Sequence, residues 1–184
     1  AQAPINPVPT ASGITGPRVL CQGTTGTLGH SVPAFTGGTW SASPTTVATV
    51  NATTGLWGAV LTGSTTVATA TITYTLPTGC DTFITVTVNP LPAAITGVLQ
   101  LCEGDTTVLS SATPGGTWSG GSAAIGTINA TTGVFHGIAS GTTMVTYTAP
   151  GTSCFVTAFV TVNALPGMIT AATDLCKNAA DTVY

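Results

Sequence analysis

Charged side chains are nearly missing from this sequence of 184 residues, since only 4% are Asp, Glu, Lys or Arg, whereas an ordinary soluble domain carries about 25%. The seven charged residues are Arg18, Lys177, Asp81, Glu103, Asp105, Asp174 and Asp181. Nucleic-acid binding is excluded because neutralising phosphates needs clustered Lys and Arg. The same shortage argues against acid–base and metal-dependent catalysis. We therefore expect no enzyme, no cofactor and no metal site.

Long apolar runs are also missing, although the mean hydropathy is +0.49. Thr, Gly or Pro interrupts every apolar stretch within a few positions. No transmembrane helix is expected, because one needs about 20 apolar residues in a row. Histidine is scarce too: His30 and His136 have no acid nearby, and no Gly-x-Ser-x-Gly element is present. Nothing therefore indicates Ser–His catalysis.

Threonine is what the sequence has in abundance, with 41 residues, many of which alternate with Val, Ile, Ala or Tyr. Its β-branched side chain suits strands, and its hydroxyl keeps a solvent face polar without charge. A hydrophobic content of 43% with this alternation can bury a core, unlike a disordered chain. The sequence predicts an all-β protein.

An internal repeat sets the domain organisation. The segment Ile5-Asn6-Pro7-Val8-Pro9 returns near Val88 and again near Val162, so the spacings are 83 and 74 residues. The other landmarks that return are the Leu-Cys pairs ending at Cys21, Cys102 and Cys176, the Gly-Gly-Thr-Trp-Ser segments around Trp40 and Trp118, the Asn-Ala-Thr-Thr-Gly segments beginning at Asn51 and Asn129, and the pair Cys80 and Cys154.

Two complete repeats and part of a third are expected. The predicted boundaries are 7–89 for the first, 90–163 for the second and 164–184 for the opening strands of the third. Residues 1–6 resemble the end of a preceding repeat, or a mature N-terminus left by a signal peptidase. About seven short strands between Gly, Pro and Asn turns are typical of a β-sandwich. Clear strands are predicted at 46–51, 67–76, 82–89, 125–129, 142–149 and 155–163.

The five cysteines follow the repeat. We expect one disulfide within each full copy, joining Cys21 to Cys80 and Cys102 to Cys154, at one end of each sandwich. Closing loops of that length contributes on the order of 4 kcal/mol in the chain-entropy model. Five free buried thiols are the alternative, while zinc is disfavoured because neither His lies near a Cys pair. Disulfides indicate an oxidising, extracellular setting.

Cys176 stands at the position of Cys21 and Cys102 but has no matching partner before Tyr184. Three explanations stay open: the chain is a window on a longer array, another subunit completes the third domain, or the thiol is free. In the second case residues 164–184 would supply strands to a neighbouring subunit.

These residues resemble a known family. The segment 47–56 (VATVNATTGL), followed by 70–74 (ATITY), is similar to the core motif of bacterial Ig-like repeats of the group 2 type. The Val-Asn-Pro-Leu-Pro junctions and Leu-Cys openings resemble tandem repeats of large secreted surface and adhesin-like proteins of Bacteroidetes. The resemblance implies tandem Ig-like β-sandwiches, secretion by the type IX route, and a structural or adhesive role. Trp57, where Val is usual, departs from it.

Several side chains are candidates for contacts or modification. Trp57 and Phe135 follow the Asn-Ala-Thr-Thr-Gly turns, where exposure as interface anchors is expected; Trp40 and Trp118 are expected in the cores. Asn-x-Thr patterns make Asn51 and Asn129 glycosylation candidates, although a structural role in the turns is favoured. The resemblance adds Thr106 and Thr182, in Asp-Thr patterns, as sites of O-glycosylation.

The predicted function is a non-catalytic structural module of an extracellular filament or cell-surface stalk. With so few charges there is little repulsion to keep copies apart, so other copies of the chain are the expected partners. The alternative is a surface adhesin or carbohydrate-binding repeat, for which Trp57 would contact surface glycans.

Overall fold

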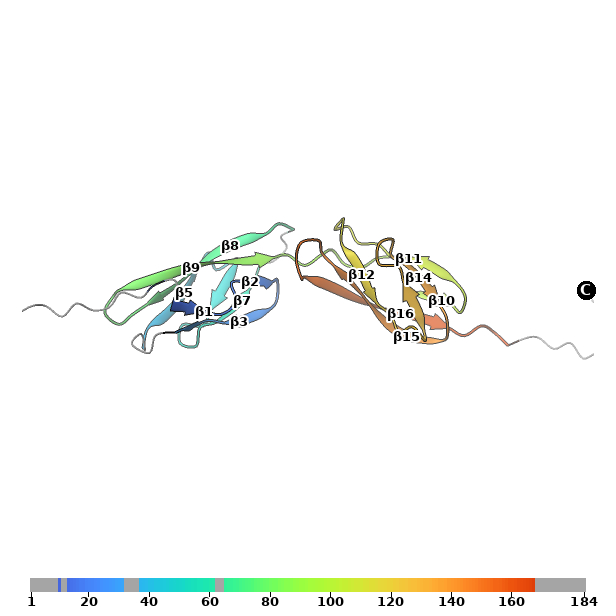
Figure 1. Cartoon of the computed structure of the whole chain (residues 1–184), viewed down its shortest axis with the longest axis horizontal. Coiled ribbons are helices and arrows are strands. Elements are labelled where there is room, and N and C mark those ends of the chain that lie inside the picture. Colours follow the sequence, from blue (N-terminus) through green and yellow to red (C-terminus); the bar gives the residue numbers. More distant parts are fainter. Residues whose placement is uncertain (1–9, 11–12, 32–36, 62–64, 168–184) are drawn as a thin grey trace, which may run out of the picture.

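The computed structural model describes residues 10, 13–31, 37–61 and 65–167, and this part of the chain is all-β (Figure 1). The strands predicted from alternation are confirmed, with ends that move by a residue or two. The described segments contain no helix that is long and apolar enough to cross a membrane.

The first sandwich consists of two sheets that face each other. One has four strands in the order β2-β9-β8-β5, and the other has three strands in the order β3-β7-β6. The short strands β1 and β4 pair with each other as a separate two-stranded antiparallel sheet. The strands are β1 (Ile14–Thr15), β2 (Val19–Cys21), β3 (Thr25–Thr27), β4 (Gly29–His30), β5 (Thr39–Ser43), β6 (Ala48–Val50), β7 (Leu56–Ala59), β8 (Ala68–Thr75) and β9 (Asp81–Asn89).

The second sandwich repeats this strand order, with sheets β10-β16-β15-β12 and β11-β14-β13. Its strands are β10 (Gln100–Cys102), β11 (Thr106–Val108), β12 (Thr117–Gly120), β13 (Gly126–Ile128), β14 (Val134–Gly137), β15 (Gly141–Thr148) and β16 (Phe155–Asn163). In both copies all neighbours are antiparallel except one: β2 runs parallel to β9, and β10 runs parallel to β16. Two facing sheets with these connections form the Ig-like sandwich, which confirms the predicted fold class.

Each sandwich has its own core, because successive residues of a strand point to opposite faces. In β8, the side chains of Ala70, Ile72 and Tyr74 are buried and those between them are not. The two cores form separate clusters. Trp40 and Trp118 are buried, as expected, and each packs on a tyrosine, with ring centroids 4.6 and 4.7 Å apart.

The expectation that Trp57 and Phe135 are exposed is wrong, because both side chains are 0% exposed. They lie at the centres of β7 and β14, each between two strands of the three-stranded sheet. The indole N–H of Trp57 donates a hydrogen bond to the carbonyl of Pro17 at 3.2 Å. These aromatic side chains therefore fill the cores and are unavailable as interface anchors.

The Asn-Ala-Thr-Thr-Gly segments are hairpin turns, as predicted, and connect β6 to β7 and β13 to β14. The Oδ1 of Asn129 accepts hydrogen bonds from the backbone N–H groups of Thr131 and Thr132, at 3.0 and 2.9 Å. Asn51 makes the same pair of bonds in the first copy. Gly133 closes its turn at φ 71°, a conformation that favours glycine.

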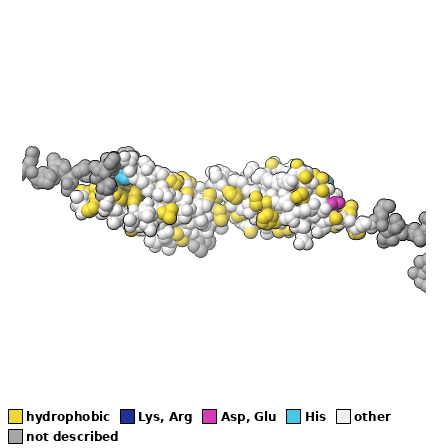
Figure 2. Space-filling view, turned by 90° about the horizontal axis from the view of Figure 1, so that it is seen from below, with side chains coloured by type: hydrophobic (Ala, Val, Ile, Leu, Met, Phe, Trp, Pro, Cys, Tyr) yellow, Lys and Arg dark blue, Asp and Glu magenta, His cyan; other side chains and the backbone are white. Residues whose placement is uncertain are grey.

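The two sandwiches lie end to end (Figure 1). The strand β9 runs toward the second sandwich and leads into the connecting segment, while β10 lies at the far end of the second sandwich (Figure 1). The face shown in Figure 2 carries few charged side chains, in keeping with the composition.

Candidate functional site at the interdomain junction

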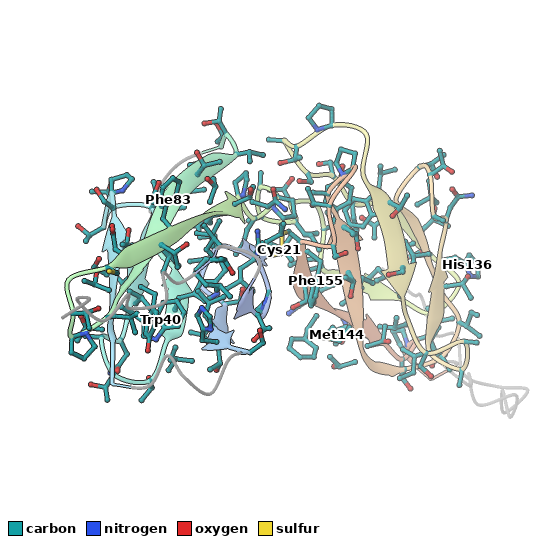
Figure 3. All side chains as sticks on the ribbon, turned by 60° about the vertical axis from the view of Figure 1, so that its left-hand side comes forward. Cys21, Trp40, Phe83, His136, Met144 and Phe155 are labelled. Atoms are coloured by element: carbon teal, nitrogen blue, oxygen red, sulfur yellow. A yellow bond between two sulfur atoms is a disulfide. The ribbon has the colours of Figure 1, made fainter. Side chains whose placement is uncertain are left out.

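A disulfide between the two sandwiches is the most informative feature of the junction. It joins Cys21, the last residue of β2, to Cys154, the residue before β16. Their Cα atoms lie 5.5 Å apart although 133 residues separate them in sequence. Figure 3 shows Cys21 at the boundary between the two sandwiches.

This bond corrects the predicted pairing of Cys21 with Cys80 and of Cys102 with Cys154. Cys21 stands beside Asn89, at the end of β9, whereas Cys80 directly precedes the start of that strand. The nine steps from Cys80 to Asn89, at about 3.3 Å for each step, place these two positions roughly 30 Å apart. A disulfide needs Cα atoms within about 7 Å. The same register separates Cys102 from Cys154 along β16, so each sandwich carries its two cysteines at opposite ends.

Backbone hydrogen bonds hold Cys21 where the chain leaves the first sandwich. The N–H of Thr87 donates to the carbonyl of Arg18 at 2.7 Å, and the N–H of Gln22 donates to the carbonyl of Asn89 at 2.8 Å. Together they keep β2 alongside the end of β9. The thiol position is therefore fixed by the four-stranded sheet.

Cys154 is fixed in a similar way by the β15–β16 hairpin. The N–H of Ala149 donates to the carbonyl of Cys154 at 2.9 Å, and the N–H of Cys154 donates to Oγ1 of Thr152 at 3.2 Å. Cys154 is only 1% exposed. The bond thus links two rigid elements, one from each sandwich.

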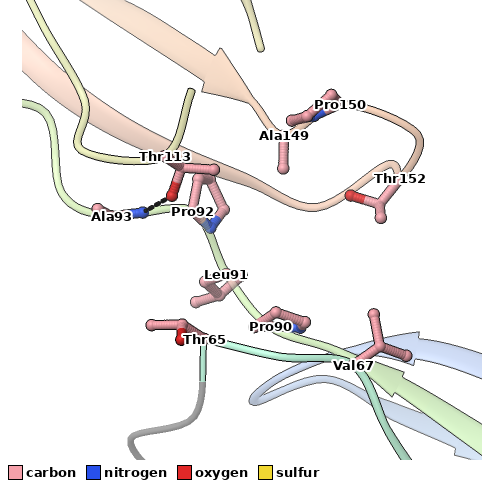
Figure 4. A pocket seen from close by; sticks show the side chains of 10 residues that line it. All are labelled: Thr65, Val67, Pro90, Leu91, Pro92, Ala93, Thr113, Ala149, Pro150 and Thr152. Carbon is pink, nitrogen blue, oxygen red and sulfur yellow. Dashed lines mark hydrogen bonds between the residues drawn. The ribbon is translucent and has the colours of Figure 1, made fainter. Parts of the chain in front are cut away.

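The connecting segment Pro90-Leu91-Pro92 forms a second link beside the disulfide. It lies along a cavity of about 250 Å³ whose lining comes from both sandwiches, including Val67 from the first and Pro150 from the second (Figure 4). The N–H of Ala93 donates to Oγ1 of Thr113 at 2.8 Å, which fastens the end of the segment to the second sandwich. The residues that line this cavity include no ionisable side chain. They therefore contribute packing between the sandwiches and offer no acid or base.

An exposed apolar cluster on the second sandwich escaped the sequence analysis. Phe155 and Phe159 on β16 are 54% and 66% exposed, and Figure 3 shows Phe155 and Met144 on the second sandwich. Met144 on β15 is 47% exposed and pairs with Phe159 across the two strands. In the first sandwich, the residues at the positions of Phe155 and Phe159 are Asp81 and Thr85. That departure from the repeat was the available signal in the sequence.

The few titratable groups do not converge on a site within the described ranges. No group of three His, Cys, Asp or Glu side chains there could hold a metal ion. Oε1 of Glu103 accepts a hydrogen bond from the N–H of Ser140 at 2.6 Å, so this acid fixes a turn. Burial lowers the pKa of His30 below its usual 6.5, and its ring packs 5.7 Å from that of Tyr74.

The remaining predicted site residues stay untested. Asn51, Asn129 and Thr106 are exposed, so glycosylation there stays a prediction. Thr182 and Cys176 lie outside the described residues. Cys80 and Cys102 are free thiols, each half-buried.

No protein-family model matches the sequence, and no curated protein matches it. Similar solved structures include the S-layer protein rSbsC, which is 15% identical with a TM-score of 0.36 over 90% of this chain and 29% of its own. A C-terminal fragment of intimin, in complex with the intimin-binding domain of its translocated receptor, is 15% identical with a TM-score of 0.41 over 76% of this chain and 57% of its own. Domains EC1–2 of human protocadherin-24 are 10% identical with a TM-score of 0.37 over 82% of this chain and 95% of their own.

The chain therefore spans less than a third of the S-layer protein and a little over half of the intimin fragment. At these identities and scores the likeness concerns the class of fold alone. The assignment of an Ig-like sandwich rests on the strand order given above.

Proposed function

We propose that this chain is a non-catalytic structural module of an extracellular filament or cell-surface stalk, which self-associates through its Ig-like domains. The observation that carries the proposal is the Cys21–Cys154 bond between the sandwiches. A single flexible connection lets neighbouring domains move freely, which is the default for domains with a small interface. Here a disulfide and a proline-containing segment both cross the junction, so relative rotation is restrained at two points.

A restrained junction suits a part that must keep its length and direction. Proline-rich connections are semi-rigid and extended. The Cys21–Cys154 disulfide adds a second covalent link beside the Pro90-Leu91-Pro92 segment. Persistent disulfides form in oxidising compartments, which supports an extracellular location. The bacterial cell surface, secretion by the type IX route and membership of the group 2 Ig-like repeats follow from the sequence resemblance and belong to the proposal.

Self-association is supported by the surface chemistry. The formal net charge is only −3, so long-range repulsion between copies is weak. The exposed side chains of Phe155, Phe159 and Met144 add apolar area on the second sandwich. Repeat boundaries at 7–89, 90–163 and 164–184, with the last segment donated to a neighbour, complete the proposal.

Negative-stain electron microscopy and sedimentation velocity of the intact chain, oxidised and reduced, test this function. We expect ordered filaments with a regular axial repeat under oxidising conditions. Deleting 164–184 should abolish assembly while both sandwiches stay folded by circular dichroism. A chain that stays monomeric at every concentration, with both sandwiches folded, would contradict the proposal.

The second candidate is a carbohydrate-binding adhesin. Trp57 cannot contact a glycan because it is buried. Phe155 and Phe159, two exposed aromatic side chains on the same strand, support this candidate instead. A glycan array separates the two functions. We expect no signal; binding that Phe159→Ala abolishes and Phe83→Ala, at an exposed position of the first sandwich, leaves intact would favour the adhesin.

A further inference from the structure

We infer that Cys102 of one copy forms a disulfide with Cys80 of a second copy, which links the modules head to tail in the manner of the Cys21–Cys154 bond. This inference rests on the proposed self-association and gives it a covalent mode. The partner is a second copy of this chain, because the chain carries a second pair of equivalent cysteines. Cys102 is equivalent to Cys21 and lies at one end of the molecule, and Cys80 is equivalent to Cys154 and lies at the other.

Cys102 reproduces the position of Cys21. Cys21 stands opposite Asn89 in the β2–β9 pair, and Cys102 stands opposite Asn163 in the β10–β16 pair. The following turn is the same as well: the carbonyl of Cys21 accepts the N–H of Thr24 at 3.0 Å, and the carbonyl of Cys102 accepts an N–H three residues on at 3.1 Å. Cys102 is therefore placed at the outer end of the second sandwich in the same way that Cys21 is placed at the junction end of the first.

Cys80 reproduces the position of Cys154. The carbonyl of Cys80 accepts the N–H of Leu76 at 2.8 Å, and the carbonyl of Cys154 accepts the N–H of Ala149 at 2.9 Å. Each cysteine is the last residue before the long strand that follows. Both hairpins thus present a thiol at the same end of their sandwich.

The two free thiols lie at opposite ends of the molecule. Strand β9 begins at the outer end of the first sandwich, and β10 lies at the outer end of the second (Figure 1). Cys80 and Cys102 are both half-buried, whereas Cys154, which the junction covers, is 1% exposed. A contact of this kind joins different surfaces of identical copies, so it propagates from copy to copy and gives an open filament where the rotation between copies does not close a ring.

The side chains around the free thiols differ from those at the junction in charge. Glu103 and Asp105 follow Cys102, where Gln22 and Thr24 follow Cys21, and Asp81 follows Cys80. Bringing two such ends together places like charges near each other, which slows association at low salt. We therefore expect the intermolecular bond to form faster at higher ionic strength.

The bond forms by exchange with a small-molecule disulfide, such as oxidised glutathione. The Cys102 thiolate attacks one sulfur of that disulfide, which makes a mixed disulfide and releases one glutathione thiolate. The Cys80 thiolate of the second copy then attacks the Cys102 sulfur and releases the second. The two cysteine sulfurs are oxidised, the two glutathione sulfurs are reduced, and the two cysteine protons end on glutathione.

The test mixes two complementary variants of the full chain, both carrying Cys176→Ser. Cys80→Ser keeps only the Cys102 end reactive, and Cys102→Ser keeps only the Cys80 end. With oxidised glutathione, we expect each variant alone to stay monomeric on a non-reducing gel, their mixture to form dimers only, and the chain with both thiols to form a ladder. Peptic peptides, prepared in acid to stop exchange, should contain Cys80 linked to Cys102.

Circular dichroism and an intact Cys21–Cys154 bond in each variant show that both sandwiches are folded, and Cys80→Ala and Cys102→Ala replace any variant that fails this check. A mixture that stays monomeric, or single variants that dimerise as well as the mixture, would overturn the inference. If filaments form while the chain with both free thiols gives no ladder, the proposed function stands and the disulfide is wrong. If the chain with all its cysteines neither cross-links nor associates, both are wrong.

Discussion

At the residue scale, Trp57 and Phe135 show how the neighbouring strands help to decide which side chain is buried. In β7, Leu56 is 46% exposed while its neighbour Trp57 is buried, and alternation alone is compatible with either phase. Glycines on neighbouring strands leave room for these rings. A Cβ on Gly126 would lie 2.3 Å from the ring of Phe135, and one on Gly26 would lie 2.5 Å from Pro17 and 3.3 Å from the indole of Trp57. The sequence predicted the hairpin turn before each ring but not the bounds of the strand that follows it or the strands beside it, so this outcome could not be foreseen.

Phe135→Ala should destabilise the second sandwich strongly, because truncating a fully buried aromatic side chain costs about 3–5 kcal/mol. The matched control is Phe159→Ala, at a position 66% exposed, where we expect a change within about 0.5 kcal/mol. Chemical denaturation of both variants, followed by tryptophan fluorescence, measures the difference. Equal destabilisation by the two substitutions would show that the burial is wrong.

Asn129→Ala removes the acceptor for two backbone N–H groups of the β13–β14 turn. We expect a loss of about 1–2 kcal/mol of unfolding free energy, because each hydrogen bond contributes on the order of 1 kcal/mol. Asn129→Asp keeps an acceptor oxygen while removing the glycan acceptor, so it should unfold close to the unmodified chain. If the Asp variant is as unstable as the Ala variant, the acceptor oxygen does not stabilise the turn. Extra mass in native material that Asn129→Asp removes would show that the side chain carries a glycan.

At the scale of elements, the parallel pairing of β2 with β9 determines the cysteine chemistry. The sequence placed the long strands within a residue or two, because Thr alternates there with apolar residues. It did not reveal that β2 runs parallel to β9, which sends Cys21 to the opposite end from Cys80. Recurrence of both cysteines in each copy fits a bond within a repeat and a bond between repeats equally well, and only strand direction separates the two.

Cys21→Ser should loosen the junction while leaving both sandwiches folded. Their cores form separate clusters, so the bond restrains the relative position of the sandwiches more than it holds either one together. Small-angle X-ray scattering should show a broader distribution of interdomain distances in this variant, and circular dichroism should show unchanged strand content. Both the Cys21→Ser chain and its matched control, which keeps Cys21, carry Cys80→Ser and Cys102→Ser, so that neither can cross-link to a second copy through these thiols. An unchanged distance distribution in Cys21→Ser would mean that the proline-containing segment alone sets the junction.

At the scale of the whole molecule, two Ig-like sandwiches are joined in line by a segment and a disulfide, and the outer ends carry the same cysteine positions unbonded. The low charge that excluded nucleic-acid binding is also what lets identical copies approach. The repeat was evident in the sequence. The disulfide between the two repeats was not, because it depends on which ends of the two sandwiches meet.

The central claim is the tie between the two sandwiches, and disulfide mapping of the oxidised, unmodified chain tests it most directly. Peptic digestion in acid followed by tandem mass spectrometry should recover the peptide containing Cys21 linked to the peptide containing Cys154. Recovery of Cys21 linked to Cys80, with Cys102 linked to Cys154, would contradict the account, because each bond would then lie within one sandwich and nothing covalent besides the connecting segment would hold the two in line.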